Sequence, residues 1–514
     1  MTARRLDVHR DAYVDSVGLL NVSRDMREVT GVEWANAVMA TPANLDLLTE
    51  AGFDTGEPGS LTVNDLVLAV AAETDEAADE ALTVASEFLR GGGPTTEPVA
   101  DARAAVPRTL EQAAASLGDA NLAIVSVPGP YAAMEAHKAL SLGLHVLLFS
   151  DNVPLADEVE LKRRAADRQL LVMGPGAGTA MLAGTGLGFA NVVRRGPVRV
   201  VAAAGTGAQE VAVLLHRWGS GVSEIVGVGG RDLSEQVGAT MALMAVAAEP
   251  GVHGPLLLVS KPPAPDVAEA VLDALPSGSS VCAFMGLDRD LDVPDGVRVA
   301  STLEGAVLEM LDILGADVPE PGAGLREVAS GAAESLKAER RAVRGIFSGG
   351  TLCYEAMVVL SRRLGVVHSN TPLRDGWRLP APDGAHVCLD LGEEEYTRNR
   401  PHPMIDPLAR ADEIERAAAD PTTAVLLLDV VLGHGAHPDP AGELAKILRR
   451  VVDRDAGPAV VAYVLGTDDD PQPAADQRAR LEEAGCLVAP TNARAALLAA
   501  AVASRRPALA EEIP

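Results

Sequence analysis

The stretch VRGIFSGGTLCYEA, residues 343–356, decides how this sequence folds. It predicts a short buried strand, a glycine turn and a helix that begins near Thr351. Residues 198–211, VRVVAAAGTGAQEV, have the same form. Both stretches read Val-Arg, an apolar strand and then Gly-Thr-x-x-x-Glu, and both continue into an apolar helix. Two copies in one chain indicate a duplicated domain.

Each glycine turn has the features of an anion site. Glycine lets the backbone turn sharply and approach a ligand closely. The helix that follows presents unpaired N–H groups and the positive end of its dipole. We expect the two helix N-termini to face one centre, where Gly205, Thr206, Gly350 and Thr351 would bind a carboxylate or phosphate group. The alternative is two ordinary strand–helix turns that serve packing alone.

Composition limits the classes of protein that fit. With 514 residues the chain should form several domains, and 48% hydrophobic content with only 3% aromatics predicts cores of Ala, Val and Leu. A net charge of −29 argues against nucleic acid as a partner. No apolar run reaches the roughly 18 residues of a membrane span, and the N-terminus does not resemble a secretory signal. Four scattered cysteines predict neither disulfides nor a metal site and suit a reducing cytoplasm.

The chain then divides by its rhythm of strands and helices. The N-terminal region reads as α/β, with strands expected at 16–22 and 34–40 and a helix at 42–51. After it, short apolar strands alternate with helices, which implies parallel, doubly wound sheets. The predicted parts are an N-terminal region at 1–112, a Rossmann-like domain at 113–195, the first Gly-Thr unit at 196–315, a linker at 316–340 and the second unit at 341–514.

Polar turns follow the strands of the Rossmann-like domain. Ligands of such sheets lie at the carboxyl ends of the strands. We therefore expect a cofactor to bind there. The predicted cofactor-binding residues are Ser126, Pro128, Ser150, Asp151 and Asn152.

The middle of the chain resembles the α-subunit of succinyl-CoA synthetase. VSVPGPY at 125–131 looks like that family's V-P-A-P-F strand end, and SDNVP at 150–154 is similar to its T-E-G-I-P turn. MGPGAG at 173–178 resembles M-I-G-P-N-C-P-G, and residues 204–210 resemble S-R-S-G-T-L-T-Y-E. The resemblance implies a CoA-binding-like Rossmann domain followed by two flavodoxin-like ligase domains.

Over nearly its whole length the chain is identified as a member of the FdrA family of acyl-CoA synthetase-like proteins. The motifs that carry this are MATPAN at 39–44, FSDNV at 149–153, GGRDLS at 229–234, VSKPP at 259–263, RPHPMIDP at 400–407 and LDVVLG at 428–433. The resemblance implies operon-encoded partner subunits, a homo- or hetero-oligomer, and a role in oxamate carbamoyl transfer during ureide breakdown.

The sequence departs from the synthetase pattern in the parts that make a phosphohistidine. GLDRD at 286–290 stands where the synthetase carries its G-H-A-G loop, and SKPP at 260–263 replaces the Gly-Glu-x-Gly-Gly turn whose carboxylate orients that histidine. A Gly-rich CoA loop and an ATP-grasp domain also have no counterpart. His434 and His437 follow a different strand, so we do not expect them to replace the missing histidine.

Several other residues are candidates for chemistry. His402 and Asp406 lie in a proline-rich loop and could form a general base with its carboxylate, beside Arg400 for a substrate carboxylate; the alternative is a structural loop. Arg231 and Asp232 could orient a substrate or cap a helix. Lys261, at a strand end, could bind an oxyanion or lie in solvent.

Three functions fit these observations. The preferred one is a subunit of a group-transfer complex that acts on carbamoyl phosphate or an acyl phosphate, because such a substrate arrives already activated. The second is an ADP-forming acyl-CoA synthetase that needs an ATP-grasp partner and CoA. The third is a non-catalytic scaffold or sensor.

Overall fold

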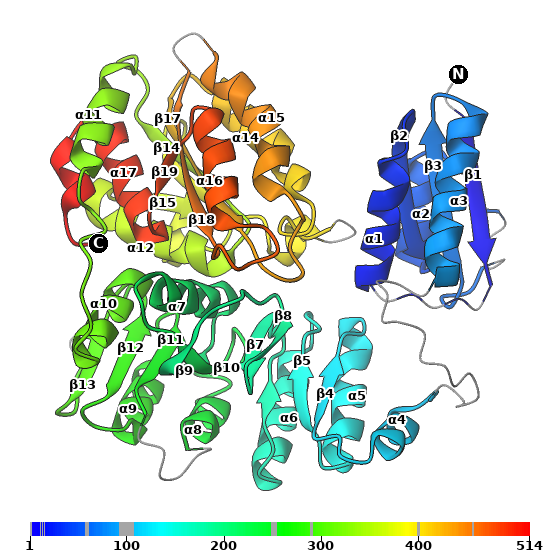
Figure 1. Cartoon of the computed structure of the whole chain (residues 1–514), viewed down its shortest axis with the longest axis horizontal. Coiled ribbons are helices and arrows are strands. Elements are labelled where there is room, and N and C mark those ends of the chain that lie inside the picture. Colours follow the sequence, from blue (N-terminus) through cyan, green and yellow to red (C-terminus); the bar gives the residue numbers. More distant parts are fainter. Residues whose placement is uncertain are drawn as a thin grey trace. The chain divides into compact units, whose positions relative to one another are not determined.

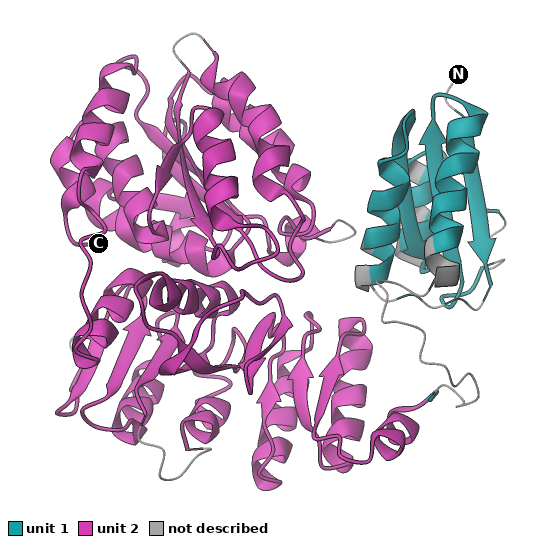
Figure 2. Ribbon diagram, in the orientation of Figure 1, with its two compact units in different colours: residues 1–108 teal, residues 109–514 magenta. Residues whose placement is uncertain are grey.

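The chain forms two compact units, residues 1–108 and residues 109–514 (Figure 2). The computed structural model describes residues 3–10, 12, 14, 16–56, 61–91, 107–247, 254–287, 291–397, 401–454 and 457–514. Among these residues, no helix is both long enough and apolar enough to cross a membrane.

Unit 1 is a small antiparallel sheet with helices on both faces. Its strand order is β1-β3-β2, and all seven residues of the central strand β3 are buried. Helices α1 and α3 cover one face of the sheet. Helix α2 covers the other face, where a second, smaller group of hydrophobic residues is buried. The elements are β1 (Ala3–His9), α1 (Ser16–Arg27), β2 (Val32–Met39), α2 (Pro42–Glu50), β3 (Leu66–Ala72) and α3 (Asp75–Gly91).

The expected strand at 16–22 is wrong, because these residues begin helix α1. Val22 and Met26, one helical turn apart, are both fully buried in the core. The predicted strand at 34–40 and the helix at 42–51 correspond to β2 and α2, and the Thr41 side chain caps α2 by accepting the N–H of Asn44.

Unit 2 begins with a small parallel sheet in the order β4-β5-β6 (Figure 1). The elements of this Rossmann-like part are α4 (Leu110–Leu117), β4 (Leu122–Val125), α5 (Gly129–Ser141), β5 (His145–Leu148), α6 (Leu155–Asp167) and β6 (Val172–Met173).

The first module, residues 179–313, contains the first Gly-Thr copy in a seven-stranded sheet of order β13-β12-β11-β9-β10-β7-β8. Strand β7 pairs with β10, so residues 179–188 belong to this sheet rather than to the Rossmann-like part, where the sequence placed them. The elements are β7 (Thr179–Leu182), β8 (Thr185–Gly188), β9 (Arg195–Ala202), α7 (Gly205–Arg217), β10 (Val222–Gly227), α8 (Thr240–Ala247), β11 (Leu256–Ser260), α9 (Pro265–Ala274), β12 (Ser280–Phe284), β13 (Val297–Ala300) and α10 (Leu303–Ile313).

The second module, residues 342–511, contains the second copy in a six-stranded parallel sheet of order β15-β16-β14-β17-β18-β19. Its helices and 3-10 turns are α12 (Gly350–Leu364), η1 (Asp375–Trp377), α13 (Glu394–Thr397), η2 (Pro407–Arg410), α14 (Ala411–Ala419), α15 (Pro440–Val452), α16 (Ala474–Glu483), α17 (Asn492–Ser504) and η3 (Pro507–Glu511). Its strands are β14 (Ala342–Phe347), β15 (Val367–Ser369), β16 (His386–Asp390), β17 (Thr423–Val431), β18 (Ala459–Leu465) and β19 (Leu487–Ala489).

The two modules share one strand order. Five parallel strands run β10-β9-β11-β12-β13 in the first and β16-β14-β17-β18-β19 in the second. Both correspond to the flavodoxin-like order 2-1-3-4-5. Helix α7 follows the central strand β9 as α12 follows β14, so the sequence duplication corresponds to a structural one. The predicted α/β class with parallel, doubly wound sheets is confirmed.

The modules also share a hydrophobic core. Helices α7, α10, α12 and α17 lie between the two sheets (Figure 1), and one continuous cluster joins buried side chains such as Leu215, Met310, Met357 and Leu498. The predicted linker at 316–340 is only partly irregular: it contains α11 (Leu325–Glu334), whose Leu325, Ala329 and Ala333 are buried at helical spacing. This shared core fixes the position of α7 against α12.

Two buried glutamates cross between the modules. Glu210 of α7 accepts a hydrogen bond from the Tyr463 hydroxyl at 2.6 Å and one from the backbone of Asn492, at the start of α17. Glu355 of α12 accepts one from the Leu303 backbone N–H, at the start of α10, at 2.6 Å. Burial is the main cause that raises the pKa of Glu210 to about 8, and repulsion from Glu355 adds to it. Burial also raises the pKa of Glu355 to about 7.

Candidate functional site

The N-termini of α7 and α12 meet. The backbone N–H of Thr351 donates to Thr206 Oγ1 at 3.2 Å, and both threonines are buried. A Cβ on Gly207 would lie only 2.9 Å from Thr351 Cγ2, so glycine permits this close approach. Within the described residues, the N–H groups of Gly205, Thr206 and Gly350 have no hydrogen-bond partner. Paired helix ends with unpaired donors are the arrangement that the duplicated motif predicts for an anion site.

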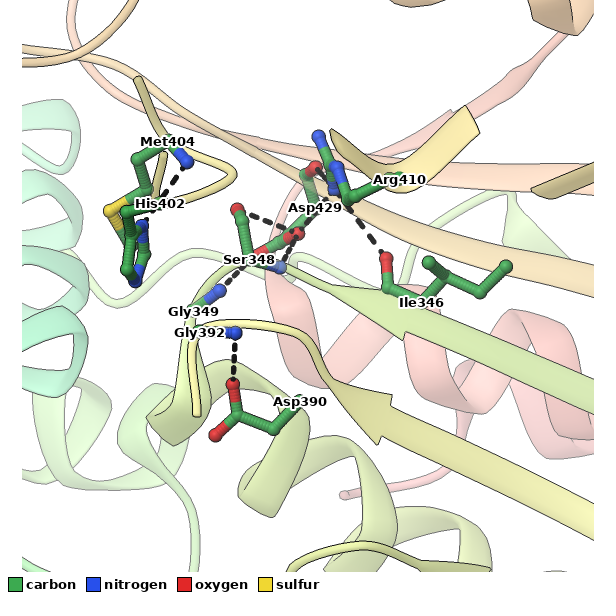
Figure 3. A network of polar contacts seen from close by, with 9 residues as sticks. All are labelled: Ile346, Ser348, Gly349, Asp390, Gly392, His402, Met404, Arg410 and Asp429. Carbon is green, nitrogen blue, oxygen red and sulfur yellow. Dashed lines mark hydrogen bonds and ion pairs between the residues drawn. The ribbon is translucent and has the colours of Figure 1, made fainter. Parts of the chain in front are cut away.

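A buried ion pair holds the turn before α12. Asp429, on β17, accepts the backbone N–H groups of Ser348 and Gly349, each at 2.7 Å (Figure 3). Its carboxylate also binds Arg410 Nη1 at 2.9 Å, and both side chains are at most 1% exposed. Because Asp429 takes up two N–H groups of the turn, it orients the turn and leaves Gly350 as its open donor.

A second aspartate lies directly beside Gly350. Asp390, at the end of β16, is 2% exposed, and its Oδ1 accepts the N–H of Gly392 at 3.0 Å. Its Oδ2 lies against Gly350, on the side where a Cβ would stand, and has no hydrogen-bond partner within the described residues. Burial, with some repulsion from Glu393, raises the pKa of Asp390 to about 7, and Lys261 opposes that rise.

His402 faces the same turn (Figure 3). Its Nδ1 accepts the backbone N–H of Met404 at 3.2 Å, and burial lowers its pKa to about 4. The ring is therefore neutral near pH 7 and carries its proton on Nε2. A Cβ on Gly392 would lie 2.7 Å from Nε2, 3.1 Å from Ser348 O and 3.2 Å from Asp390 Oδ1. His402 thus presents a hydrogen-bond donor, which argues against the predicted role of general base.

Asp406 lies close to His402 in the same loop, and its backbone N–H donates to His402 O at 3.0 Å. Its Oδ1 accepts the N–H of Leu408 at 3.1 Å and caps η2. A role for Asp406 as the carboxylate partner of His402 stays a prediction. Arg400 lies outside the residues that the structure describes.

Lys261 brings a positive charge from the first module to the second. It follows β11, and its Nζ lies 5.3 Å from the centre of the Tyr354 ring on α12. Its charge acts on both Asp390 and Cys353. Binding of an oxyanion by Lys261 stays a prediction. Cys353 is fully buried, and burial raises its pKa, so its thiol is not a nucleophile in this fold.

Arg231 and Asp232 lie elsewhere, in an ion network with helix α6. Lys162 Nζ is 2.9 Å from both Asp232 and Glu158, and Arg231 Nε is 2.7 Å from Glu158. Burial raises the pKa of Asp232 to about 6 in spite of Lys162. These charges join the Rossmann-like part to the first module. The prediction that they bind substrate is not supported, because their charges are balanced within the protein.

The predicted cofactor residues are at the strand ends of the Rossmann-like part, as expected. Ser150 is buried and bridges two strands: its Oγ accepts the Val127 N–H at 2.9 Å and lies 3.2 Å from Val125 O. The others are exposed, and Asn152 has a φ of 58°. Two stacked phenylalanines connect this edge to the site, because Phe149 lies 5.9 Å from Phe189 and Phe189 lies 6.2 Å from the His402 ring.

This edge does not suit the pyrophosphate of CoA. Helix α5 has prolines at positions 128 and 130, which lack N–H groups, and a Cβ on Gly129 would lie 2.5 Å from Asp151 O. Helix α6 carries Asp157 and Glu158 in its first turn. Neither helix N-terminus is open to an anion, so the residues at this edge do not fit the pyrophosphate of CoA.

Three residues of the site were not predicted as functional, namely Asp390, Asp429 and Arg410. A signal was present for the two aspartates, since each lies in or at the end of an apolar strand of a parallel sheet, near the edge where ligands bind. Arg410 carried no such signal. His437 is structural, since its Nδ1 accepts the N–H of Asp439 at the start of α15.

Two family models match parts of this chain. Residues 346–502 match the family described as CoA-ligase, and residues 1–107 match the AllF heavy metal-associated domain. The α-2 subunit of mitochondrial ADP-forming succinate–CoA ligase from Trichomonas vaginalis is 28% identical over 27% of this chain and 47% of that protein. PH0766 from Pyrococcus horikoshii OT3 covers 76% of this chain and 85% of its own, at 15% identity and a TM-score of 0.27.

The fold and the site thus define a succinyl-CoA synthetase-like protein with a CoA-ligase domain. Uncharacterized protein YahF of Escherichia coli K12 is 34% identical over 96% of this chain and 98% of its own length. The chain belongs to the FdrA family, together with YahF.

A heavy-metal site does not fit unit 1. All four cysteines lie beyond residue 280, so residues 1–107 supply no thiolate. Within the described residues, no group of three or more His, Cys, Asp or Glu side chains could hold a metal ion. Residues 1–107 therefore match the domain family in sequence but contain no cysteine thiolate to bind a heavy metal.

Proposed function

We propose that the protein is a subunit of a group-transfer complex that acts on carbamoyl phosphate or an acyl phosphate without a phosphohistidine. One observation carries the proposal: α7 and α12 meet with unpaired N–H groups at Gly205, Thr206 and Gly350, while residues 285–295 after β12 contain no histidine. A phosphoryl group can be bound there, and no enzyme residue of the synthetase type is present to accept it.

The side chains around α12 suit transfer of a carbamoyl or acyl group. Lys261 would balance charge on the phosphoryl group, and the Nε2–H of His402 would donate to an oxygen that becomes negative as the carbonyl carbon is attacked. With a ureide such as oxalurate, a phosphate oxygen attacks the carbamoyl carbon, a C–O bond forms and the C–N bond breaks. The hydroxyl proton of hydrogen phosphate passes to the leaving nitrogen, which yields carbamoyl phosphate and oxamate.

The test is turnover with operon-encoded partners. The chain is purified with the products of its neighbouring genes and incubated with oxalurate and phosphate, and release of carbamoyl phosphate is measured. The alternative of an ADP-forming acyl-CoA synthetase is favoured by the match to succinate–CoA ligases, and it predicts ATP- and CoA-dependent thioester formation in the same preparation. Label from γ-labelled ATP on a histidine of this chain would overturn our proposal. No turnover with any partner would favour a scaffold or sensor.

The helix-terminus site has its own test. We expect Thr206→Val with Thr351→Val to abolish binding of carbamoyl phosphate, because the double change replaces both buried hydroxyls with methyl groups and breaks the hydrogen bond that joins the two helix ends. Isothermal titration calorimetry measures the affinity. Thr83→Val, an exposed threonine in unit 1, is the matched control and should bind as the unchanged protein does. Unchanged affinity in the double variant would exclude this site.

A further inference from the structure

Asp390 lies beside the position where the proposed anion would bind. Its Oδ2 is unpaired within the described residues and lies against Gly350, whose N–H is one of the open donors of the site. The side chain is 2% exposed, so water screens its charge weakly. An aspartate buried to this extent and directed at a helix N-terminus already acts as an internal anion for that helix.

A bound anion and an ionised Asp390 would therefore repel each other at short range. Two negative groups that share a poorly solvated site do not both remain charged, and the usual result is that one of them takes up a proton. A sulfate or phosphate dianion keeps its charge on the open N–H groups of α7 and α12. The aspartate is the group that can become neutral, and a neutral carboxyl can donate a hydrogen bond to the anion.

We propose that binding of a phosphoryl or sulfate anion at the N-terminus of α12 is coupled to the uptake of one proton by Asp390. The inference rests on the proposed function for the existence of the anion site, and it adds a pH dependence that the site alone does not require. With hydrogen phosphate bound, the protonated carboxyl would pass its proton to the leaving nitrogen and take up the hydroxyl proton of the phosphate, so that one proton is transferred in all.

The charged neighbours of Asp390 are compatible with this coupling. Its pKa of about 7 means that roughly half of the molecules are ready to bind an anion near neutral pH. Lys261 supplies a positive charge that favours both the carboxylate and an anion, while Asp429 is already paired with Arg410. The other titratable groups near it are Glu393 on the exposed loop, the neutral His402 and the neutral Cys353 on α12.

Sulfate is the appropriate probe because it remains a dianion over the whole pH range of interest. Calorimetric titration of the full chain with sulfate, in buffers of different ionisation enthalpy, gives both the affinity and the number of protons taken up. We expect uptake approaching one proton above pH 7, with the affinity falling about tenfold for each further pH unit. Asp390→Asn should bind sulfate without proton uptake and with little pH dependence. Glu393→Gln removes a nearby exposed carboxylate and should keep the proton uptake.

The outcomes separate the inference from the function it rests on. Sulfate binding without proton uptake in the unchanged protein would overturn the coupling and leave the anion site intact. Proton uptake that persists in Asp390→Asn would likewise assign the proton to another group. If neither protein binds sulfate or carbamoyl phosphate at any pH between 6 and 8.5, both the anion site and the coupling are wrong.

Discussion

At the scale of single residues, the buried pair of Arg410 and Asp429 determines the geometry of the turn before α12. Asp429 accepts N–H groups from Ser348 and Gly349 as well as the guanidinium of Arg410. A buried carboxylate that loses its cation keeps most of its desolvation cost and loses its compensation. Removal of Arg410 alone should therefore destabilise the protein as well as disturb the turn.

We expect Arg410→Met to lower the free energy of unfolding by about 3–5 kcal/mol, because it leaves Asp429 as an uncompensated buried charge. Urea-induced unfolding followed by circular dichroism measures the change. Arg163→Met is the matched control: Arg163 pairs with Asp167 on the surface, both side chains being about two-thirds exposed. That substitution should change stability by less than about 1 kcal/mol. Equal effects of the two variants would contradict the importance of the buried pair.

The buried Glu210 predicts a pH dependence of stability. Its folded pKa of about 8 exceeds the ordinary value of 4.5, with burial as the main cause. The stabilisation that it contributes is complete below pH 4.5 and is lost as the pH rises to about 8, because the unfolded chain ionises first. Glu210→Gln removes this loss and can still accept the Tyr463 hydroxyl. The Tm of the variant should therefore rise relative to the unchanged protein between pH 5 and pH 8.

Thermal unfolding across that pH range is the measurement, and Glu482→Gln, an exposed glutamate on α16, is the control with no expected change in slope. A Tm difference between Glu210→Gln and the unchanged protein that stays constant with pH would show that Glu210 does not titrate as inferred.

The residues of the site were predictable only where the sequence repeats itself. Thr206 and Thr351 were found because the same motif occurs twice, and the structure brings them to 3.2 Å. Asp390 and Asp429 were not, because their roles depend on which strand edge faces which helix end across the sheet. For Arg231 and Asp232 the sequence offered two roles, and the structure favours helix capping, because Asp232 accepts the N–H of Ala242 in the first turn of α8. Their ionic partners lie about 70 residues away on α6, where the sequence carries no signal.

At the scale of elements, the contact of α7 with α12 depends on glycine. A Cβ on Gly207 would meet Thr351 Cγ2 at 2.9 Å and Val259 Cγ1 at 3.0 Å. Both contacts are shorter than carbon atoms tolerate, so a side chain would push the two helix ends apart. Gly331, in the middle of α11, has no atom within 4 Å of a built Cβ.

These two helix glycines make a matched pair. We expect Gly207→Ala to destabilise the protein by about 1–3 kcal/mol and to weaken anion binding, because the added methyl group separates α7 from α12. We expect Gly331→Ala to be neutral or to stabilise by up to about 1 kcal/mol, since alanine favours helix and fits without a clash. Chemical unfolding and sulfate titration of both variants test this. Equal stability in the two would exclude tight packing at Gly207.

The parallel class of the sheets was predictable from apolar strands that alternate with helices, and the errors lie at short or ambiguous segments. Residues 16–22 read as a strand because their apolar run was cut short before Met26, which completes the helical spacing of α1. Helix α11 was hidden in a stretch rich in glycine, proline and glutamate, and its burial against neighbouring helices gives it order that the local sequence does not.

At the scale of the whole unit 2, the two modules depend on each other. Their helices α7, α10, α12 and α17 form one core, so neither module covers its own apolar face. We expect residues 109–340 and residues 341–514 to aggregate or bind a hydrophobic dye when each is produced alone. Produced together, they should form a soluble complex. Size-exclusion chromatography and dye fluorescence measure both outcomes, and a monomeric, dye-free second module would contradict the shared core.

The crossed glutamates have a consequence for how the two modules came to be joined. Separate subunits must find each other by diffusion, and two buried carboxyl groups at their contact would weaken that association. A covalent connection through residues 316–341 makes the association intramolecular. Each module then experiences the other at an effective concentration in the millimolar range. Each module then meets its counterpart whatever the affinity of the contact. The chain can therefore keep acidic groups at the centre of the contact. We would expect a freely dissociating pair of subunits to lose such groups.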